Sequence, residues 1–490
     1  MRMLTALALS LALGGQARAQ APATATSPGT QTPARPDRSA LPVPGPTPRL
    51  QLPAVQKHTL GNGLRVWIIE RHTVPTAQVA LVVRSGSAAD PSGKYGLASL
   101  TAAMLTEGAG GRGSLDIADE LDFLGADLGA SSSFDATLVG LSVPVARLAP
   151  ALAVMADVVI RPDFPQSELD RLREQRLTGL RTAKDNPPAI ASFAFPLAVY
   201  GRGHRYGTTV GGTSETIKSL TRDDLRQFHD THFRPDQAAL VVTGDVTPAT
   251  VLPLLETALG GWRAPAGASP TVTVPVPAPV KARTVTIVDK PGAAQSVIQI
   301  GGVGVPRNTP DYFALEVLNT VLGGSFTSRL NQNLREEHGY AYGASSAFDM
   351  RRQAGPFVVD AAVQADKTAE AVTEFMKELN AIRTPIPADE LAKAKNYVAL
   401  SFPGQFETSS DLAGAYAALI VHDLPDDYYA TYVDRVLAVT AADTERAARK
   451  YIQPERLAVV IVGDRQAIEP KVKALALGPV QALGVDDVVK

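Results

Sequence analysis

Histidine side chains are the first candidates for metal chemistry in this chain, because it contains no cysteine and thiolate ligands are therefore excluded. Of the seven histidines, only His229 and His232 stand close together, as His-x-x-His. A zinc-binding helix of this kind needs two imidazoles one turn apart and a carboxylate that activates water. No Glu stands between these two, and His232 follows the predicted end of a helix over residues 222–229. We therefore predict one imidazole that caps the helix and one that packs, with no metal between them.

The chain is organised around residues 86–108, GSAADPSGKYGLASLTAAMLTEG. An apolar run over residues 79–83 precedes this stretch and predicts a strand, and residues 90–93 are typical of a turn. After the turn, Leu97, Leu100 and Met104 recur at helical spacing. The pattern predicts a strand, a turn segment and then a helix.

The first part of this stretch resembles a segment of the insulinase/pitrilysin-like (inverzincin) zinc metallopeptidases, Gly-Ser-x-x-(Asp/Glu)-x-x-Gly-x-x-Gly-Leu-Ala. The matching residues are Gly86, Ser87, Asp90, Gly93, Gly96, Leu97 and Ala98. In that family the segment leads into a helix that carries His-x-x-Glu-His. The resemblance places Ser99 and Ala103 at the two His positions and Ala102 at the Glu position. It therefore implies a degenerate motif that can neither hold zinc nor activate water.

The third zinc ligand of the family is a Glu on a later helix, roughly 75 to 80 residues further along the chain. Counted from the degenerate motif, this position falls near Gly179 and Leu180, and neither residue has a carboxylate. All four functional positions are therefore empty. The resemblance implies that this chain has no metal of its own.

A second family segment lies in the C-terminal half, where residues 323–342 read GGSFTSRLNQNLREEHGYAY. It resembles the family pattern G-G-x-x-S-R-L-x-x-x-(L/V)-R-E-x-x-G-x-x-Y, whose second Arg and final Tyr face the zinc site. These positions are Arg335 and Tyr342 here, with Tyr340 as a competing tyrosine. A guanidinium is always charged and offers several donors, and a phenol can stabilise a developing oxyanion. Arg329 in the same segment is expected to be structural.

The resemblance implies a non-catalytic subunit of a heterodimeric zinc metallopeptidase. In this interpretation the partner is a homologue with an intact His-x-x-Glu-His motif and binds the zinc, while this chain supplies Arg335 and Tyr342. The substrates are peptides or small unfolded proteins. The alternative is a non-enzymatic scaffold or peptide-binding protein of the same fold. An intact Arg/Tyr pair favours the peptidase complex, because a scaffold has no use for it.

Composition places the chain among ordinary globular proteins and limits its partners. It has 490 residues, of which 45% are hydrophobic and 20% charged, and this length suggests at least two domains. The formal net charge is -2, so no basic excess indicates nucleic acid as a partner. Residues 1–19 combine Arg2, a short apolar run and Ala17-Arg18-Ala19, which predicts a signal peptide and a periplasmic or secreted protein. No later run is long enough to span a membrane.

Two Pro-rich stretches divide the rest of the chain. Residues 20–53 are rich in Pro, Ala and Thr and predict a disordered segment, and residues 263–283 predict an extended linker. An N-terminal domain over residues 54–262, with the degenerate motif, and a C-terminal domain over residues 284–480, with the Arg/Tyr pair, are expected on either side of the linker.

The two domains are expected to be repeats of each other. FRPDQAALVVTGD at residues 233–245 recurs as IQPERLAVVIVGD at 452–464, and GASSSFD at 129–135 recurs as GASSAFD at 343–349. These matches occur in the same order at nearly the same offset. Strands alternate with helices in each half, so we predict an α+β fold with two homologous domains. Each domain should be a mostly antiparallel sheet with helices on one face.

Overall fold

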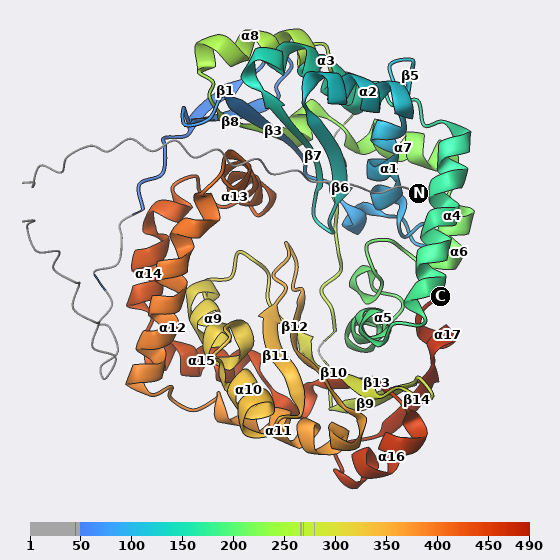
Figure 1. The fold of residues 1–490 in the computed structure, drawn as a ribbon, viewed down its shortest axis with the longest axis vertical. Coiled ribbons are helices and arrows are strands. Elements are labelled where there is room, and N and C mark those ends of the chain that lie inside the picture. The colour runs from blue at the N-terminus through green and yellow to red at the C-terminus, as the bar shows by residue number, and fades with distance from the viewer. Residues whose placement is uncertain (1–44, 46–49, 265–266, 268, 279) are drawn as a thin grey trace, which may run out of the picture. The chain divides into compact units, whose positions relative to one another are not determined.

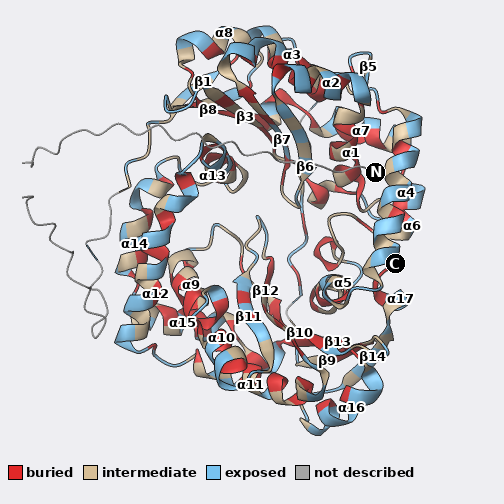
Figure 2. Cartoon of the chain, viewed as in Figure 1, coloured by how far each residue is buried: buried red, intermediate tan, exposed pale blue. Residues whose placement is uncertain are grey.

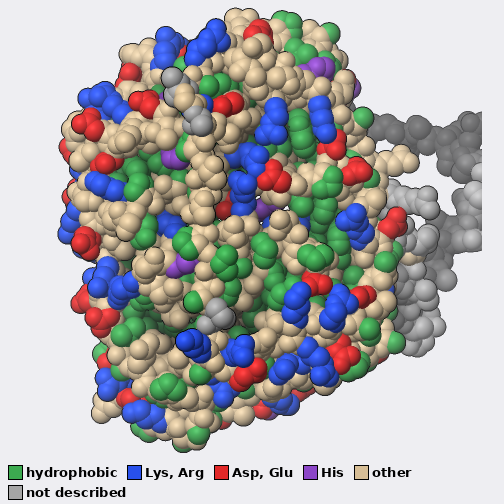
Figure 3. All heavy atoms as spheres, turned by 180° about the vertical axis from the view of Figure 1, so that it is seen from behind, with side chains coloured by type: hydrophobic (Ala, Val, Ile, Leu, Met, Phe, Trp, Pro, Cys, Tyr) green, Lys and Arg blue, Asp and Glu red, His purple; other side chains and the backbone are tan. Residues whose placement is uncertain are grey.

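The structure is a computed structural model that describes residue 45 and residues 50–264, 267, 269–278 and 280–490. The predicted signal peptide over residues 1–19, and nearly all of the Pro-rich segment over 20–53, lie outside these residues. Residues 47–490 form one compact unit. Within the described residues, no helix is long and apolar enough to cross a membrane. Basic, acidic and hydrophobic side chains are interspersed on the face seen from behind (Figure 3), in keeping with the near-zero net charge.

The first sheet has six strands and lies in the N-terminal half (Figure 1). In spatial order they are β1 (Gln56–Thr59), β2 (Arg65–Glu70), β8 (Ala238–Gly244), β3 (Thr76–Val83), β7 (Thr137–Pro144) and β6 (Asp127–Ser132). Only the pairing of β2 with β8 is parallel. Asn62-Gly63 forms the turn of a hairpin, because β1 pairs antiparallel with β2 and Gly63 adopts the positive φ of 89° that the turn requires.

The second sheet repeats this plan in the C-terminal half. Its order is β11 (Ala341–Phe348), β12 (Pro356–Gln364), β10 (Gln295–Val303), β13 (Ala458–Gly463), β9 (Thr284–Asp289) and β14 (Val480–Gly484). The two pairings that involve β9 are parallel and the other three are antiparallel. The predicted α+β fold with two helix-covered sheets is therefore confirmed, and the second sheet includes a strand that extends beyond residue 480.

The helices of the N-terminal half mostly follow the apolar periodicity of the sequence. They are α1 (Leu97–Met104), α2 (Ser114–Leu124), α3 (Leu148–Ile160), α4 (Gln166–Ala183), α5 (Pro187–Tyr200), α6 (Ser214–Ser219), α7 (Arg222–His232) and α8 (Pro248–Leu259). A small hairpin of β4 (Gly108–Ala109) and β5 (Arg112–Gly113) joins α1 to α2. The predicted helix over 222–229 is correct in type but too short, because α7 continues to His232.

The C-terminal half contains α9 (Tyr312–Asn319), α10 (Arg329–Asn331), α11 (Thr368–Ala381), α12 (Ala388–Ser401), α13 (Ser409–Val421), α14 (Tyr432–Ala438), α15 (Ala441–Tyr451), α16 (Arg465–Ala474) and α17 (Val485–Val488). Two π-helical segments, Thr320–Gly324 and Gln332–Glu337, flank α10. Such segments insert an extra residue into a helical turn and are frequent at functional sites.

Each sheet is covered on both faces, which differs from the prediction of helices on one face. Every residue of β8 and of β13 is buried (Figure 2), so these strands have no solvent face. Helix α5 of the N-terminal half packs on β10 and β13 of the second sheet. Helix α13 of the C-terminal half packs on β3 and β8 of the first sheet. Along the chain, α5 and α13 are separated by nearly the same number of residues as the sequence repeats. The two helices are therefore equivalent elements of the two halves, and each one covers the sheet of the other half.

Phe195 of α5 is the large side chain through which this exchange can be tested. It is 4% exposed and belongs to the same cluster as Val297 and Val460 of the second sheet. We predict that Phe195→Ala lowers the free energy of unfolding by about 3–5 kcal/mol, because it leaves a cavity between α5 and the sheet.

The matched control for this variant is Phe123→Ala on α2, where the ring is 76% exposed. Its effect should stay within about 0.5 kcal/mol. Chemical denaturation of both variants measures the difference. Equal stabilities for the two variants would contradict the packing of α5 on the second sheet.

Candidate functional site

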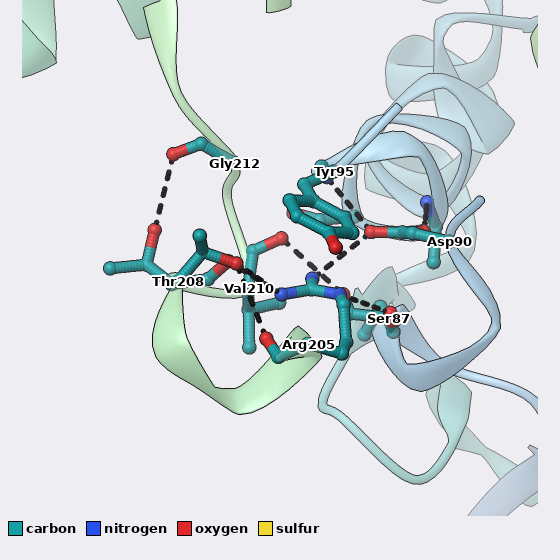
Figure 4. Close-up of polar contacts among 12 residues, drawn as sticks. Ser87, Asp90, Tyr95, Arg205, Thr208, Val210 and Gly212 are labelled. Atoms are coloured by element: carbon teal, nitrogen blue, oxygen red, sulfur yellow. Dashed lines mark hydrogen bonds and ion pairs between the residues drawn. The ribbon is translucent and has the colours of Figure 1, made fainter. Parts of the chain in front are cut away.

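A buried ion pair fixes the segment that leads from β3 into α1. Asp90 accepts hydrogen bonds from the backbone N–H groups of Gly96 and Ala98, each at 2.8 Å, at the start of α1. The guanidinium of Arg205 donates to the Asp90 carboxylate at 3.0 Å (Figure 4). The side chains of Asp90 and Arg205 are 0% and 5% exposed. The matching lead-in residues therefore act as a helix N-terminus anchored by a carboxylate.

Arg205 connects this anchor to several neighbouring segments. Its Nε donates to the carbonyl of Ser87 at 2.6 Å, and its guanidinium lies over the ring of Tyr95 at 4.7 Å from the centroid (Figure 4). Burial raises the pKa of Asp90, while Arg205 and the backbone donors oppose this shift. Burial also lowers the pKa of Arg205. Each charge thus depends on the other, because an unpaired charge at this depth is costly.

The residues that the resemblance aligns with the family's zinc motif lie on α1. Ala102 is 1% exposed, and Ser99 and Ala103 are half-buried. Arg176 of α4 extends to this position and donates from Nη2 to the carbonyl oxygen of Ser99 at 2.8 Å and to its Oγ at 3.2 Å. Burial lowers the pKa of Arg176 to about 10. A guanidinium therefore lies against the first of these positions.

This donor set does not fit zinc. Zinc in proteins is bound by imidazole, thiolate or carboxylate groups, and α1 offers here a hydroxyl and two methyl groups. Arg176 adds a positive charge that repels a dication. Gly179 is exposed, and Leu180 packs with the cluster around α5. No step of a reaction is therefore assigned to a metal held by this chain.

Sequence analysis missed both arginines of this region. Arg176 follows Ser99 by 77 residues. This separation lies within the range at which the family places its third zinc ligand. The same spacing could therefore have pointed to Arg176 as a neighbour of Ser99. Arg205 stands next to His204 in GRGHRYG, and no local pattern connects it with Asp90, which is 115 residues away.

The two neighbouring histidines of α7 pack instead of facing each other across an ion. His229 Nε2 donates to the carbonyl of Val159 at 2.8 Å, and its ring stacks on Phe233. The ring of His232 lies 4.5 Å from that of Phe228. Burial lowers the pKa of both imidazoles, to about 4 for His232. In the part of the chain that the structure describes, no three His, Cys, Asp or Glu residues group closely enough to hold a metal.

Arg335 and Tyr342 lie together on the surface of the C-terminal half. The guanidinium of Arg335 is 5.2 Å from the ring centroid of Tyr342 and 4.5 Å from that of Phe326. Tyr342 is 88% exposed and Phe326 is 63% exposed. Arg335 lies in the π-helical segment Gln332–Glu337, and Tyr342 is the second residue of β11. The arrangement presents a cation between two exposed rings, with a free phenol edge.

The other residues of this segment have structural contacts. Both nitrogens of the Arg329 fork bond the Glu390 carboxylate, at 2.8 and 2.6 Å, which agrees with the structural role predicted for Arg329. Tyr340 stacks on His338 with ring centroids 4.9 Å apart, and its backbone N–H donates to Leu334. Tyr340 is therefore partly packed where Tyr342 is open to solvent.

We predict that Asp90→Asn destabilises the protein by about 3–5 kcal/mol, because it leaves the Arg205 charge buried without a partner. The matched control is Asp486→Asn. Asp486 also forms an ion pair, with Lys184 at 2.5 Å, but its side chain is 87% exposed, so stability should stay close to that of the wild type. Urea denaturation of the two variants is the measurement. Similar losses in both would show that the buried pair does not hold the start of α1.

Two family models and several curated proteins match this chain. The family described as "Insulinase (Peptidase family M16)" matches residues 65–209, and "Peptidase M16 inactive domain" matches residues 219–398. An uncharacterized zinc protease of Bacillus subtilis, YmxG, is 25% identical over 344 residues, which cover 70% of this chain and 82% of that protein. An uncharacterized zinc protease of Mycobacterium tuberculosis is 28% identical over 320 residues, covering 65% and 72%.

Solved structures agree with this relationship. A peptidase M16 inactive domain from Pseudomonas fluorescens superimposes with a TM-score of 0.78 at 26% identity, covering 84% of this chain and 98% of that one. A protease from Helicobacter pylori gives a TM-score of 0.76 at 24% identity, covering 84% and 100%. Together with the two repeated α+β sheets and the matching lead-in to α1, these findings show that the chain is a two-domain member of the insulinase (peptidase M16) family.

Proposed function

We propose that this chain is the non-catalytic subunit of a heterodimeric zinc metallopeptidase. It contributes Arg335 and Tyr342 to a partner that carries the His-x-x-Glu-His motif, the zinc and the general base. The observation that carries this proposal is the contrast between two places in the chain. On α1, the motif positions hold Ser99, Ala102 and Ala103, with the Arg176 cation against the first of them. On β11, Tyr342 is 88% exposed, and its ring lies next to Arg335.

The exposed pair has the chemistry that peptide hydrolysis needs beside a metal. As water attacks a peptide carbonyl, its oxygen becomes negative, and a phenol can donate a hydrogen bond to it. Arg335 is a permanent cation whose planar fork can bind a peptide carbonyl or carboxylate. Its only ion pair among the described residues is with Glu336 at 3.3 Å, on a half-exposed surface, so little energy opposes a change of partner.

The remaining parts of the proposal concern the environment of the complex. Peptides or small unfolded proteins are the proposed substrates, in line with the names of the relatives, which are zinc proteases. The composition of residues 1–19 supports export to the periplasm. The zinc belongs to the partner, because the donor set of α1 does not fit it.

Metal analysis tests the first half of the proposal. We predict that the purified chain holds far less than one zinc per molecule after dialysis and cleaves no fluorogenic peptide. The triple variant Ser99→His, Ala102→Glu, Ala103→His should also fail to bind zinc tightly, because Arg176 opposes the metal and no acid stands at Gly179 or Leu180. Stoichiometric zinc in the wild-type chain, with cleavage that a chelator stops, would contradict the assignment.

Kinetics of the complex test the second half. In a complex reconstituted with the His-x-x-Glu-His homologue, Tyr342→Phe keeps the ring beside Arg335 and removes only the hydroxyl. Turnover should fall about 10²–10³-fold, which corresponds to about 2.7–4 kcal/mol of transition-state stabilisation. Arg335→Ala should lower turnover at least as much and raise KM.

Tyr340→Phe is the matched control for the kinetic experiment, because its ring already packs on His338, and it should leave turnover nearly unchanged. Zinc content and subunit association are measured in parallel and should match the wild type in all variants. If Tyr342→Phe and Arg335→Ala complexes assemble and keep wild-type turnover, the alternative applies, a scaffold or peptide-binding protein of this fold.

A further inference from the structure

A polar cavity of about 290 Å³ lies where the end of β3 meets loops of the C-terminal half. It is distinct from the Arg335/Tyr342 surface and from the α1 motif positions. From the N-terminal half it is lined by Arg84, Ser85 and Tyr206, and from the C-terminal half by Arg307, Arg352 and His422, among others. Because both halves contribute, a molecule bound there contacts both.

Several polar groups of the cavity are buried without a hydrogen-bond partner among the described residues. They are Nε of Arg84, Oγ of Ser85 and Nδ1 of His422. Ser85 is only 5% exposed. Buried donors and acceptors are almost always satisfied in folded proteins, so these atoms can bond an ordered water or a polar ligand in the cavity. The Ser85 hydroxyl and the Arg84 Nε–H can both donate to it.

The charges of the cavity leave an excess of positive groups. Arg84 and Arg352 share one carboxylate, that of Asp423, with Arg352 Nη2 at 3.2 Å from it. Asp135 is the other acid of the cavity, and it accepts from the backbone N–H of Arg352 at 2.9 Å. Burial raises the pKa of Asp135, while the backbone N–H of Arg352 and the charges of Arg351 and Arg352 oppose this shift. Three arginines therefore face two carboxylates in the cavity.

Arg307 is the third cation of the cavity. No carboxylate of the described chain forms an ion pair with it; instead its guanidinium lies 3.7 Å from the ring centroid of Tyr312 and donates to the Tyr428 hydroxyl at 3.1 Å. Burial, with Arg307 and Arg352 nearby, lowers the pKa of His422 to about 4. His422 is therefore neutral near pH 7, and its unpartnered Nδ1 can donate as one tautomer.

We propose that this cavity binds a small oxyanion, a phosphate or a carboxylate group, held between Arg84, Arg307 and Arg352 with the Ser85 hydroxyl as a neutral donor. Oxygen anions with several lone pairs match the fork geometry of arginine. The volume exceeds that of a single phosphate and also admits the terminal residue of a peptide. Binding to both halves should hold the N-terminal and C-terminal sheets together.

The test uses the isolated mature chain, without any partner subunit, in a buffer free of phosphate. Isothermal titration calorimetry with inorganic phosphate should give a Kd of about 1 mM or tighter, and phosphate should raise Tm. A second arm uses an N-acetylated tripeptide with a free carboxylate and its C-terminal amide. Binding of the acid but not the amide identifies a peptide terminus as the source of the oxyanion. Binding of phosphate alone identifies a free ion.

Variants of the cavity decide whether the binding belongs there. Arg352→Gln removes one fork from a side chain that is 38% exposed, so folding should be preserved, and affinity should fall about tenfold or more. Ser85→Ala removes one neutral donor and should weaken binding less. The matched control is Arg226→Gln, an exposed arginine of α7, which should bind like the wild type.

The proposal is overturned if neither phosphate nor the free-acid peptide binds at about 10 mM. It is also overturned if binding occurs but Arg352→Gln and Ser85→Ala leave the affinity unchanged, because the ion then binds elsewhere. Neither outcome depends on zinc, on a partner or on turnover, so failure of this proposal leaves the proposed function standing.

Discussion

Strands that are buried on both faces impose the main constraint on this protein. β8 and β13 lie inside their sheets, have no exposed position and are apolar except for Thr243 and their final glycines. Most helices of each half cover one face of its own sheet, and the second face, left bare, would cost free energy in water. Helix α5 of the N-terminal half packs on the second sheet, and α13 of the C-terminal half packs on the first sheet. A chain built in this way cannot unfold one sheet without exposing the other.

In the region around α1, a buried ion pair holds the start of the helix. The Asp90 carboxylate holds the first turn of α1 and needs the Arg205 cation as its partner. These contacts do not involve the residues aligned with the metal ligands. The lead-in sequence therefore stabilises the start of α1 whether or not a metal binds. At the motif positions a second cation, Arg176, bonds to Ser99. A positive charge held by the fold thus lies against Ser99, which the resemblance aligns with a zinc ligand of the family.

Local pattern explains much of the fold. The hairpin at Asn62-Gly63, the helix α3 and the capping of α7 by Thr221 follow from turn residues, apolar spacing and N-cap preference. The sequence repeats predicted two related sheets, which the structure confirms. The exchange of α5 and α13 could not be predicted, because it depends on which apolar face meets which sheet across more than one hundred residues.

The site was predictable in part. Arg335 and Tyr342 were identified through the resemblance to a family segment, and the structure brings their side chains together. The π-helical segment that carries Arg335 leaves no sequence signature, since it differs from an α-helix by one inserted residue. Arg176 and Arg205 were missed because their partners are distant in sequence. The expectations for residues 1–19 and for the domain limits remain predictions.

The central claim is that this chain acts with a second, zinc-bearing chain of the same family. Native mass spectrometry of the protein isolated from its natural source under gentle conditions tests this claim most directly. The account predicts a one-to-one complex with a homologue that contains His-x-x-Glu-His, and one zinc that stays with the homologue when the complex is dissociated. A homodimer or monomer as the main species, or zinc that stays with this chain, would contradict it.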